Sequence, residues 1–198
     1  AANLGCGEAN RRGIESAASG GVALLNNDTE VGPGWLEALL VPMLADPSIA
    51  AACSVLELMH HPGVLNAHGG GMTWLGYGFD RAFGRPLSVL EDAPPLHDVL
   101  FPTAAAMLMR RKEFEAIGGF DRTFLMYHED VDLGWRWTLA GRRVVVVRDS
   151  RVKHAFGGTT ASRHGDAWRA RMGMRHNVRT LLKCFGAGML LRALWSIA

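Results

Sequence analysis

The stretch VALLNNDTE carries an amide and a carboxylate at the end of an apolar run, at a spacing that suits a metal ion. In an extended segment Asn26 and Asp28 project from the same face, because side chains alternate along a strand. Oxygen ligands of this kind suit Mg²⁺ or Mn²⁺, which keep several waters and bridge to the phosphates of a substrate. The alternative is that residues 26–29 are only a turn and a cap before a helix at Pro33, and the stretch alone favours that simpler interpretation.

A second group of acids stands in YHEDVDLGWRW, where Glu129 and Asp130 occupy the first turn of a predicted helix. The positive end of the helix dipole stabilises such carboxylates by roughly 0.3–1 kcal/mol each, so a purely structural role is enough to explain them. Adjacent acids at this place also provide a fixed general base, whose pKa the helix lowers and the neighbouring acid raises. Asp132 is expected to be structural, because Arg136 lies four residues later on the same helix surface.

The third candidate is His154, at the end of the apolar stretch VVVVRDSRVKH. A single histidine is more often solvated or hydrogen-bonded than a ligand, and the chain has eight. Its place at the end of a predicted strand nevertheless favours a functional role, because ligands of open α/β sheets bind beyond the carboxyl ends of the strands.

These groups need a sheet that brings the ends of several strands together, and the pattern along the chain predicts one. Apolar runs that suit strands alternate with segments of helical spacing, which indicates an α/β domain. Between residues 59 and 96 glycine, proline and aromatic residues dominate, so we expect a long irregular insertion of the kind that carries binding. Strands are predicted at residues 22–26, 49–58, 103–111 and 142–154, and helices at 7–20, 33–47, 111–119, 128–141 and 166–195.

The composition limits the classes of function. A chain of 198 residues, 48% of them hydrophobic, is enough for one domain with a sizeable core, and a net charge of +2 gives no overall attraction to nucleic acid. Three cysteines without a C-x-x-C pair argue against a disulfide framework or a structural zinc site. The sequence has no secretory signal at its start and no uncharged apolar run of the roughly 18 residues that span a membrane. We therefore expect a cytoplasmic protein.

Five segments, taken together and in order, resemble the inverting glycosyltransferases of family 2, particularly their bacterial rhamnosyltransferase-like branch. The segments are NLGCGEANRRGI, LLNNDTEVGPGWL, AAAMLMRRKEFEAIGGFDRTFLMYHEDVDLGWR, AGRRVVVVRDSRVKH and RHNVRTLLK, and they span almost the whole chain. The resemblance implies a GT-A fold, a Rossmann-like mixed sheet flanked by helices, over residues 1–160. Members of the family usually begin with a further βα unit that holds the nucleotide base, so this chain is expected to lack that unit at its N-terminus.

The resemblance also implies a role for each candidate residue. Asp28 corresponds to the metal-binding carboxylate, with Asn26 in the less acidic first place and His154 completing the shell around Mg²⁺ or Mn²⁺. Asp130 corresponds to the catalytic base, and Glu129 would hold the acceptor or orient Asp130. Asn10, Arg11, Arg12 and Asn27 correspond to residues near the donor nucleotide, and Gly118, Gly119, Phe120 and Asp121 to a turn that lines the sugar pocket.

The reaction that the resemblance implies is a single displacement with inversion. Asp130 would take the proton of an acceptor hydroxyl while that oxygen attacks the anomeric carbon of a nucleotide-sugar donor. The acceptor would be a glycan or a lipid-linked glycan of the cell envelope, and rhamnose is the sugar by analogy with the branch alone.

Two further segments are candidates for contact with the acceptor or a membrane. Trp74 and Tyr77 in HGGGMTWLGYGFDR would stack on acceptor sugars or else be aromatic residues buried in a loop. Residues 161–198 are expected to form a basic amphipathic helical segment, because Asp166 is the only acid after Asp149. That segment either packs with its basic face in solvent or lies on an anionic membrane surface.

Two other functions remain open from the sequence. A metal-dependent phosphohydrolase would use Asp28, Asp130 and His154 as ligands, although such enzymes normally need a denser cluster and often two metals. An inactive fragment would only bind a partner or a membrane.

Overall fold

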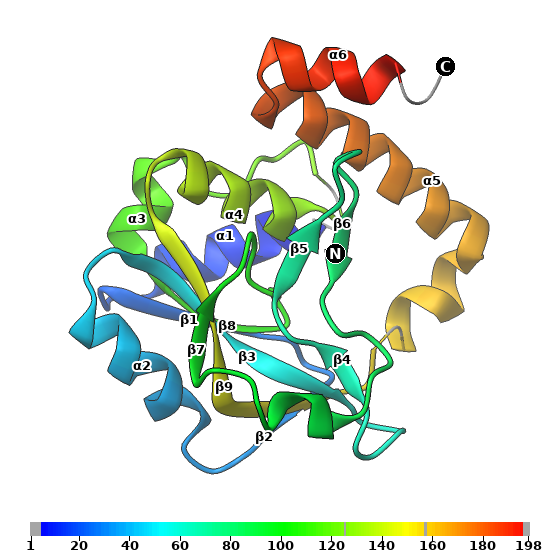
Figure 1. Cartoon of the computed structure of the whole chain (residues 1–198). Helices are drawn as coiled ribbons and strands as arrows, with labels where there is room; N and C mark the ends of the chain where they lie inside the picture. The colour runs from blue at the N-terminus through cyan, green and yellow to red at the C-terminus, as the bar shows by residue number, and fades with distance from the viewer. Residues whose placement is uncertain (1–4, 125, 157, 196–198) are drawn as a thin grey trace.

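The computed structural model describes residues 5–124, 126–156 and 158–195, and only the backbone at residues 158–164, 166, 169, 193 and 194. A seven-stranded mixed sheet lies at its centre, with helices on both faces (Figure 1). The order along the sheet is β1-β8-β3-β9-β2, and β4 pairs with β3 and β7 with β9 outside this path. β3 and β9 are parallel, and the other pairs are antiparallel. The strands are β1 (Gly21–Leu25), β2 (Thr29–Val31), β3 (Ile49–Leu58), β4 (Leu65–Ala67), β7 (Leu96–Asp98), β8 (Ala106–Arg110) and β9 (Arg143–His154).

The central strands β3 and β9 contain long apolar runs, residues 49–53 and 144–147, because alternate residues enter two separate cores. Ala51 and Cys53 of β3 pack with helices α1, α3 and α4, whereas Ala52 between them packs with α2 on the opposite face. A strand covered on both faces reads as a continuous apolar run, and this confirms the predicted α/β layers. The helices of the two layers are α1 (Cys6–Ser16), α2 (Trp35–Ala45), α3 (Arg111–Ala116) and α4 (Glu129–Leu139).

Residues 59–96 are more ordered than predicted, which corrects the expectation of an irregular insertion. The chain passes so close to Phe101 that a Cβ on Gly70 would collide with the phenyl ring. Gly70 N also donates a hydrogen bond to Phe101 O at 3.0 Å. The glycines here therefore mark close packing of backbone on a side chain, and not an absence of structure. Besides β4 and the start of β7, the segment contains β5 (Gly70–Met72), β6 (Gly78–Asp80) and the 3₁₀-helix η1 (Leu87–Leu90).

The C-terminal part of the chain is helical as predicted, and it packs on the domain through α5 (Gly158–Cys184) and α6 (Ala187–Trp195). A change of direction at Gly165, where φ is 69°, divides α5 into two parts. Trp135 of α4 stacks edge to face on Phe185, with ring centroids 4.8 Å apart. The tip of the β5–β6 hairpin reaches α5, where Gly76 lies against Leu181 (Figure 1). None of the described helices is both long and apolar enough to cross a membrane.

Candidate functional site

Asp28 and His154 come together at one edge of the sheet. Thr29 of β2 pairs with His154 at the end of β9, so the residue just before β2 lies beside the histidine. Asp28 Oδ1 is 3.3 Å from His154 Nε2, and the backbone N–H of Ala155 donates to Asp28 O at 2.9 Å. Burial lowers the pKa of His154, against the opposing effect of the Asp28 carboxylate. The ring is therefore neutral at neutral pH, and a neutral imidazole has a lone pair for a metal ion.

The residues before Asp28 form a turn, as the simpler interpretation of the sequence predicted. Asn26 O accepts a hydrogen bond from Thr29 Oγ1 at 2.6 Å, and Asn26 N donates to Ala105 O at 2.9 Å. The side chains of Asn26 and Asn27 are exposed. The second half of that interpretation is wrong, because α2 begins after Gly34 and has no side-chain cap.

Glu129 and Asp130 are the first two residues of α4 and line a cavity of about 350 Å³. Asp130 Oδ1 accepts a hydrogen bond from Val131 N at 2.9 Å, which fixes the carboxylate at the helix end. Asp80 enters the same cavity from β6. No hydrogen bond or ion pair reaches the Asp80 carboxylate from the part of the chain that the structure describes. Three carboxyl groups therefore line the same cavity.

Burial dominates the acid–base behaviour of these three carboxyl groups. It raises the pKa of Glu129 to about 7, and repulsion from Asp130 adds to the effect. The same two causes raise the pKa of Asp80 to about 7. Burial also raises the pKa of Asp130, although hydrogen bonds from the backbone, including those of Val131 and Ala104, oppose it. The sequence left open whether these pKa values are lowered by the helix or raised by the neighbouring acid. In the structure desolvation raises them, and a carboxylate with a raised pKa suits a general base.

The entry to α4 is strained. Tyr127 and His128 have φ values of 68° and 69°, and neither is glycine. Such positions cost of order 1–3 kcal/mol each and persist only where other contacts impose them. Here His176 of α5 holds the turn through Nδ1, 2.9 Å from Tyr127 O. The turn directs Asp130 into the cavity, and both strained residues also line it.

Asp132 has the structural role that its spacing from Arg136 predicted, although it is fully buried and not on the helix surface. Its carboxylate binds Arg136 at 2.6 Å and Lys183 at 2.5 Å. Arg136 also donates to Ile117 O and Gly119 O, each at 2.7 Å. These bonds join α4, α5 and the turn at residues 117–119 into one unit behind the cavity.

The residues expected to line the sugar pocket lie at that turn, and none of the four is among those that line the 350 Å³ cavity. Gly118 and Gly119 have φ values of 82° and 67°. Phe120 is buried and stacks on Phe114, with ring centroids 5.2 Å apart. Asp121 accepts a hydrogen bond from Thr123 N at 2.8 Å and binds Lys183 at 2.7 Å. The side chain of Phe120 packs in the core, and that of Asp121 joins the turn to α5.

The candidates on α1 form their ion pairs and hydrogen bonds with other residues of the same helix. Arg11 pairs with Glu8 at 2.8 Å and with Glu15, and Arg12 lies 3.2 Å from Glu8. Asn10 donates to Cys6 Sγ at 3.5 Å and lines a separate cavity of about 330 Å³ between α1 and β1. Helix α1 reaches the acidic cavity through the Cys6 thiol, which hydrogen-bonds to Glu129.

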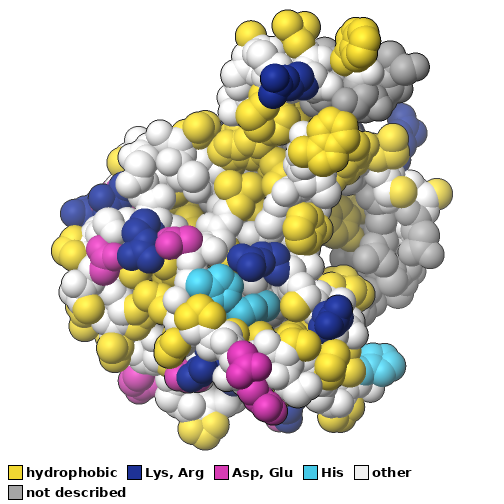
Figure 2. Space-filling model, viewed as in Figure 1, with side chains coloured by type: hydrophobic (Ala, Val, Ile, Leu, Met, Phe, Trp, Pro, Cys, Tyr) yellow, Lys and Arg dark blue, Asp and Glu magenta, His cyan; other side chains and the backbone are white. Residues whose placement is uncertain are grey.

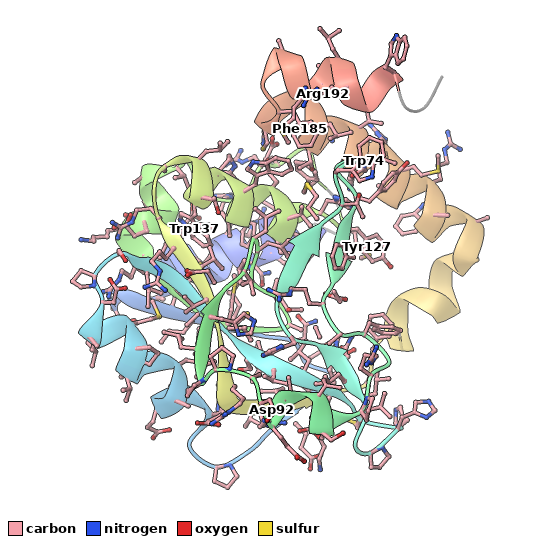
Figure 3. All side chains as sticks on the ribbon, viewed as in Figure 1. Trp74, Asp92, Tyr127, Trp137, Phe185 and Arg192 are labelled. Atoms are coloured by element: carbon pink, nitrogen blue, oxygen red, sulfur yellow. The ribbon has the colours of Figure 1, made fainter. Side chains whose placement is uncertain are left out.

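Trp74 and Tyr77 lie at the tip of the β5–β6 hairpin, with 69% and 42% of their surface exposed. Strand β6 of that hairpin, Gly78–Asp80, lines the acidic cavity. Figure 3 shows Trp74 close to the C-terminal helices, with Tyr127 farther down beside β6. The hairpin thus connects the cavity with the exposed aromatic side chains.

A family model described as "Glycosyltransferase like family 2" matches residues 3–173. The chain belongs to glycosyltransferase family 2. This confirms the family inferred from the five sequence segments.

Two relatives of this glycosyltransferase chain show the same kinship. The O-antigen biosynthesis protein RfbC of Myxococcus xanthus is 36% identical over 157 residues, which cover 76% of this chain and 12% of that protein. The N-acetylglucosaminyl-diphospho-decaprenol L-rhamnosyltransferase of Mycobacterium tuberculosis is 30% identical over 182 residues, covering 77% of this chain and 56% of that protein. The chain therefore spans about half, or much less, of the length of these relatives.

Solved glycosyltransferase structures have the same fold at low identity. The structure of GalNAc-T7 with UDP, GalNAc and Mn²⁺ superposes with a TM-score of 0.65 at 14% identity, over 90% of this chain and 34% of the other. The mannosyltransferase PcManGT of Pyrobaculum calidifontis, solved with GDP-Man and Mn²⁺, gives a TM-score of 0.53 at 16% identity, over 88% and 44% of the two chains. The predicted GT-A fold is confirmed.

The described residues of this glycosyltransferase domain fit a metal that is held mostly by its substrate. Among them, no group of three or more His, Cys, Asp or Glu side chains is placed to hold an ion. Two ligands in neighbouring positions of an octahedral shell lie about 3 Å apart, and Asp28 and His154 have this spacing. Mg²⁺ in particular is often bound by one or two protein groups and by phosphates. A phosphohydrolase, which needs the denser cluster, gains no support, and neither does an inactive binding module.

The sequence did not single out several residues of the site. Asn66 contacts His154, Asp80 faces Asp130, and Cys6 contacts Glu129. Asn66 and Asp80 lie in the insertion, where no periodicity indicated which side chains point inward. The available signal was that each is a polar residue two or three positions from a glycine.

Proposed function

We propose that this chain is a glycosyltransferase domain that transfers a sugar from a nucleoside-diphosphate donor to a hydroxyl of a glycan or a lipid-linked glycan. The main support is the position of Asp130 in the first turn of α4, where it lines the cavity and burial raises its pKa. The rhamnosyltransferase relative supports rhamnose as the sugar and a lipid diphosphate glycan as the acceptor. The product would enter cell-envelope polysaccharide, in line with the O-antigen relative.

The reaction follows from the position of the base. Asp130 accepts the proton of the acceptor hydroxyl as that oxygen attacks the anomeric carbon, and the nucleoside diphosphate leaves from the opposite side. One displacement inverts the anomeric configuration. Burial raises the pKa of Asp130, which makes it a stronger base than an isolated aspartate.

Asp28 and His154 would hold Mg²⁺ or Mn²⁺, and Asn26 and Asn27 would lie beside the bound diphosphate. When bound, such an ion neutralises the charge that develops on the departing diphosphate. The Mn²⁺ in the two neighbouring structures supports this choice.

Binding of the donor is the first property to test. Thermal unfolding of the chain is followed with a panel of nucleoside diphosphates, with and without Mn²⁺. The matching nucleotide should stabilise the chain only with Mn²⁺, by about 2.7 kcal/mol at 100 times its Kd. Asp28→Ala should abolish the effect, and Asp92→Ala should keep it, because Asp92 is exposed and is not part of the Asp28–His154 pair. Absence of a metal-dependent effect with every nucleotide would contradict the proposal.

We also propose that the C-terminal helices contact an anionic membrane surface. Met174, Val178 and Leu182 follow one another at every fourth residue of α5, and each exposes more than half of its surface. Figure 2 shows apolar side chains gathered over the C-terminal helices and the nearby hairpin. The exposed Arg171 and Arg175 lie next to this stripe in the helix, which suits phosphate headgroups.

Sedimentation with vesicles tests this contact. The chain should pellet with vesicles that contain phosphatidylglycerol, and not with purely zwitterionic ones. Leu182→Glu should abolish binding, whereas Leu139→Glu, at a position on α4 that is 63% exposed, should not. Equal binding by the two variants would refute the assignment.

A further inference from the structure

Asn66 contacts His154 on the side of the ring opposite Asp28. Asn66 Oδ1 lies 2.6 Å from His154 Nδ1, and only 1% and 8% of the two residues is exposed. Water therefore has little access to this hydrogen bond. Since Asp28 Oδ1 is 3.3 Å from Nε2, the imidazole is held between two oxygen atoms.

The backbone places Asn66 in this position by an irregularity of the sheet. In the pairing of β3 with β4, Leu56 faces Ala67 and the next residue, Glu57, faces Leu65. Asn66 is thus the extra residue of a β-bulge and has no partner in the ladder. Bulges redirect a side chain, and they are common beside active sites. Here the redirected side chain is the one that contacts His154.

The two contacts compete for the proton of the neutral ring, because each partner oxygen accepts. A neutral imidazole has one N–H and one lone pair. The contact with Asn66 Oδ1 is the shorter, 2.6 Å against 3.3 Å, and an amide oxygen can only accept, so it favours the tautomer with the proton on Nδ1 and the lone pair on Nε2. That lone pair faces the Asp28 carboxylate, which is also an acceptor. Two acceptors that face each other are stabilised when a cation lies between them.

We propose that Asn66 is a positioning residue, which holds His154 as the Nδ1–H tautomer and thereby directs Nε2 to a cation shared with Asp28. This inference rests on the proposed metal-dependent function. It adds a residue that touches neither the metal nor the sugar. Without Asn66, the proton moves to Nε2, where it donates to Asp28 and blocks the cation.

Nitrogen NMR of histidine tests the tautomer directly in the metal-free chain. Long-range ¹H–¹⁵N spectra are recorded in mildly alkaline buffer, and His154→Gln identifies the signals of His154 among the eight histidines. We expect the Nδ1–H form in the wild type, the Nε2–H form in Asn66→Leu, and the Nδ1–H form again in Asn66→Asp, whose carboxylate also accepts.

Metal affinity is the second measurement, by calorimetric titration with Mn²⁺ alone. Asn66→Leu should bind Mn²⁺ about 10–100 times more weakly than the wild type, and Asn66→Asp should recover most of the affinity. The inference is overturned if the wild type already has the Nε2–H form, a result that needs no variant to fold. It is also overturned if a folded Asn66→Leu keeps both the tautomer and the affinity. If instead Asp28→Ala leaves Mn²⁺ binding unchanged, the proposed metal site itself fails, whatever the tautomer.

Discussion

Ionisation of the buried Glu129 carboxyl group destabilises the folded chain, and Glu129→Gln tests this. The side chain is 7% exposed, and Oε2 has no hydrogen-bond partner among the described residues. Its pKa is raised from 4.5 to about 7, first by burial and then by Asp130. A raised pKa in the folded state means that the native chain holds a proton that the unfolded chain has already lost. Stability is therefore lost as the pH rises from about 4.5 to about 7.

The size of the effect follows from the pKa difference. One pKa unit corresponds to about 1.36 kcal/mol, so the charge of Glu129 costs at most about 3 kcal/mol. Asp130 shares part of this cost, which leaves roughly 1–3 kcal/mol for glutamine to recover. For a chain of this size, each kcal/mol shifts Tm by roughly 2–4 °C. Glu129→Gln should therefore raise Tm by several degrees in alkaline buffer and by little in acid buffer.

Thermal or urea unfolding across a pH series measures the difference. Glu15→Gln is the control, because Glu15 lies on the surface of α1 and its replacement should change the free energy of unfolding by less than about 0.5 kcal/mol. A Glu129→Gln variant that is less stable at every pH, or whose gain does not depend on pH, would refute the assignment of a buried charge. The gain in stability should accompany a loss of transfer activity, as is common for residues of active sites.

Two further predictions concern Asp80 in the cavity and Gly134 in α4. Burial and repulsion from Asp130 raise the pKa of Asp80 to about 7, so Asp80→Asn should leave the free energy of unfolding nearly unchanged in acid buffer and increase it above pH 7; a gain that does not depend on pH in urea unfolding would refute the buried charge. Gly134→Ala places a Cβ 2.6 Å from Leu100 O, against backbone that has little freedom to move. It should destabilise the chain by roughly 3 kcal/mol or more in urea unfolding, whereas Gly173→Ala, with open space around it, should not.

The order of strands and helices was predictable because burial leaves a direct pattern in the sequence. Residues 49–53 of β3 and 144–147 of β9 are apolar on both faces, and the spacing of Asp132 and Arg136 predicted their ion pair. The place of Asp28 at the end of a strand was predictable for the same reason. That Asp28 meets His154 depends on the pairing of β2 with β9, which the resemblance to the family indicated and local pattern did not.

The structure of residues 59–96 was not predictable, because a glycine can indicate either close packing or a loop. Gly70 and Gly78 lie where the hairpin packs on Phe101 and Val131, whereas glycine-rich segments more often mark loops. Asp80 and Asn66 depend on this packing for their direction. The raised pKa values also had no signature in the sequence, since desolvation depends on residues far apart in the chain.

The most direct test of the central claim compares acceptor-dependent sugar transfer by the wild type and by Asp130→Asn. Asparagine keeps the shape of the side chain and removes the base. Transfer should fall by at least about 100-fold, while Mn²⁺-dependent stabilisation by the nucleotide should stay unchanged. The wild-type product should have the anomeric configuration opposite to that of the donor. An Asp130→Asn variant that still transfers sugar at the wild-type rate would contradict the account.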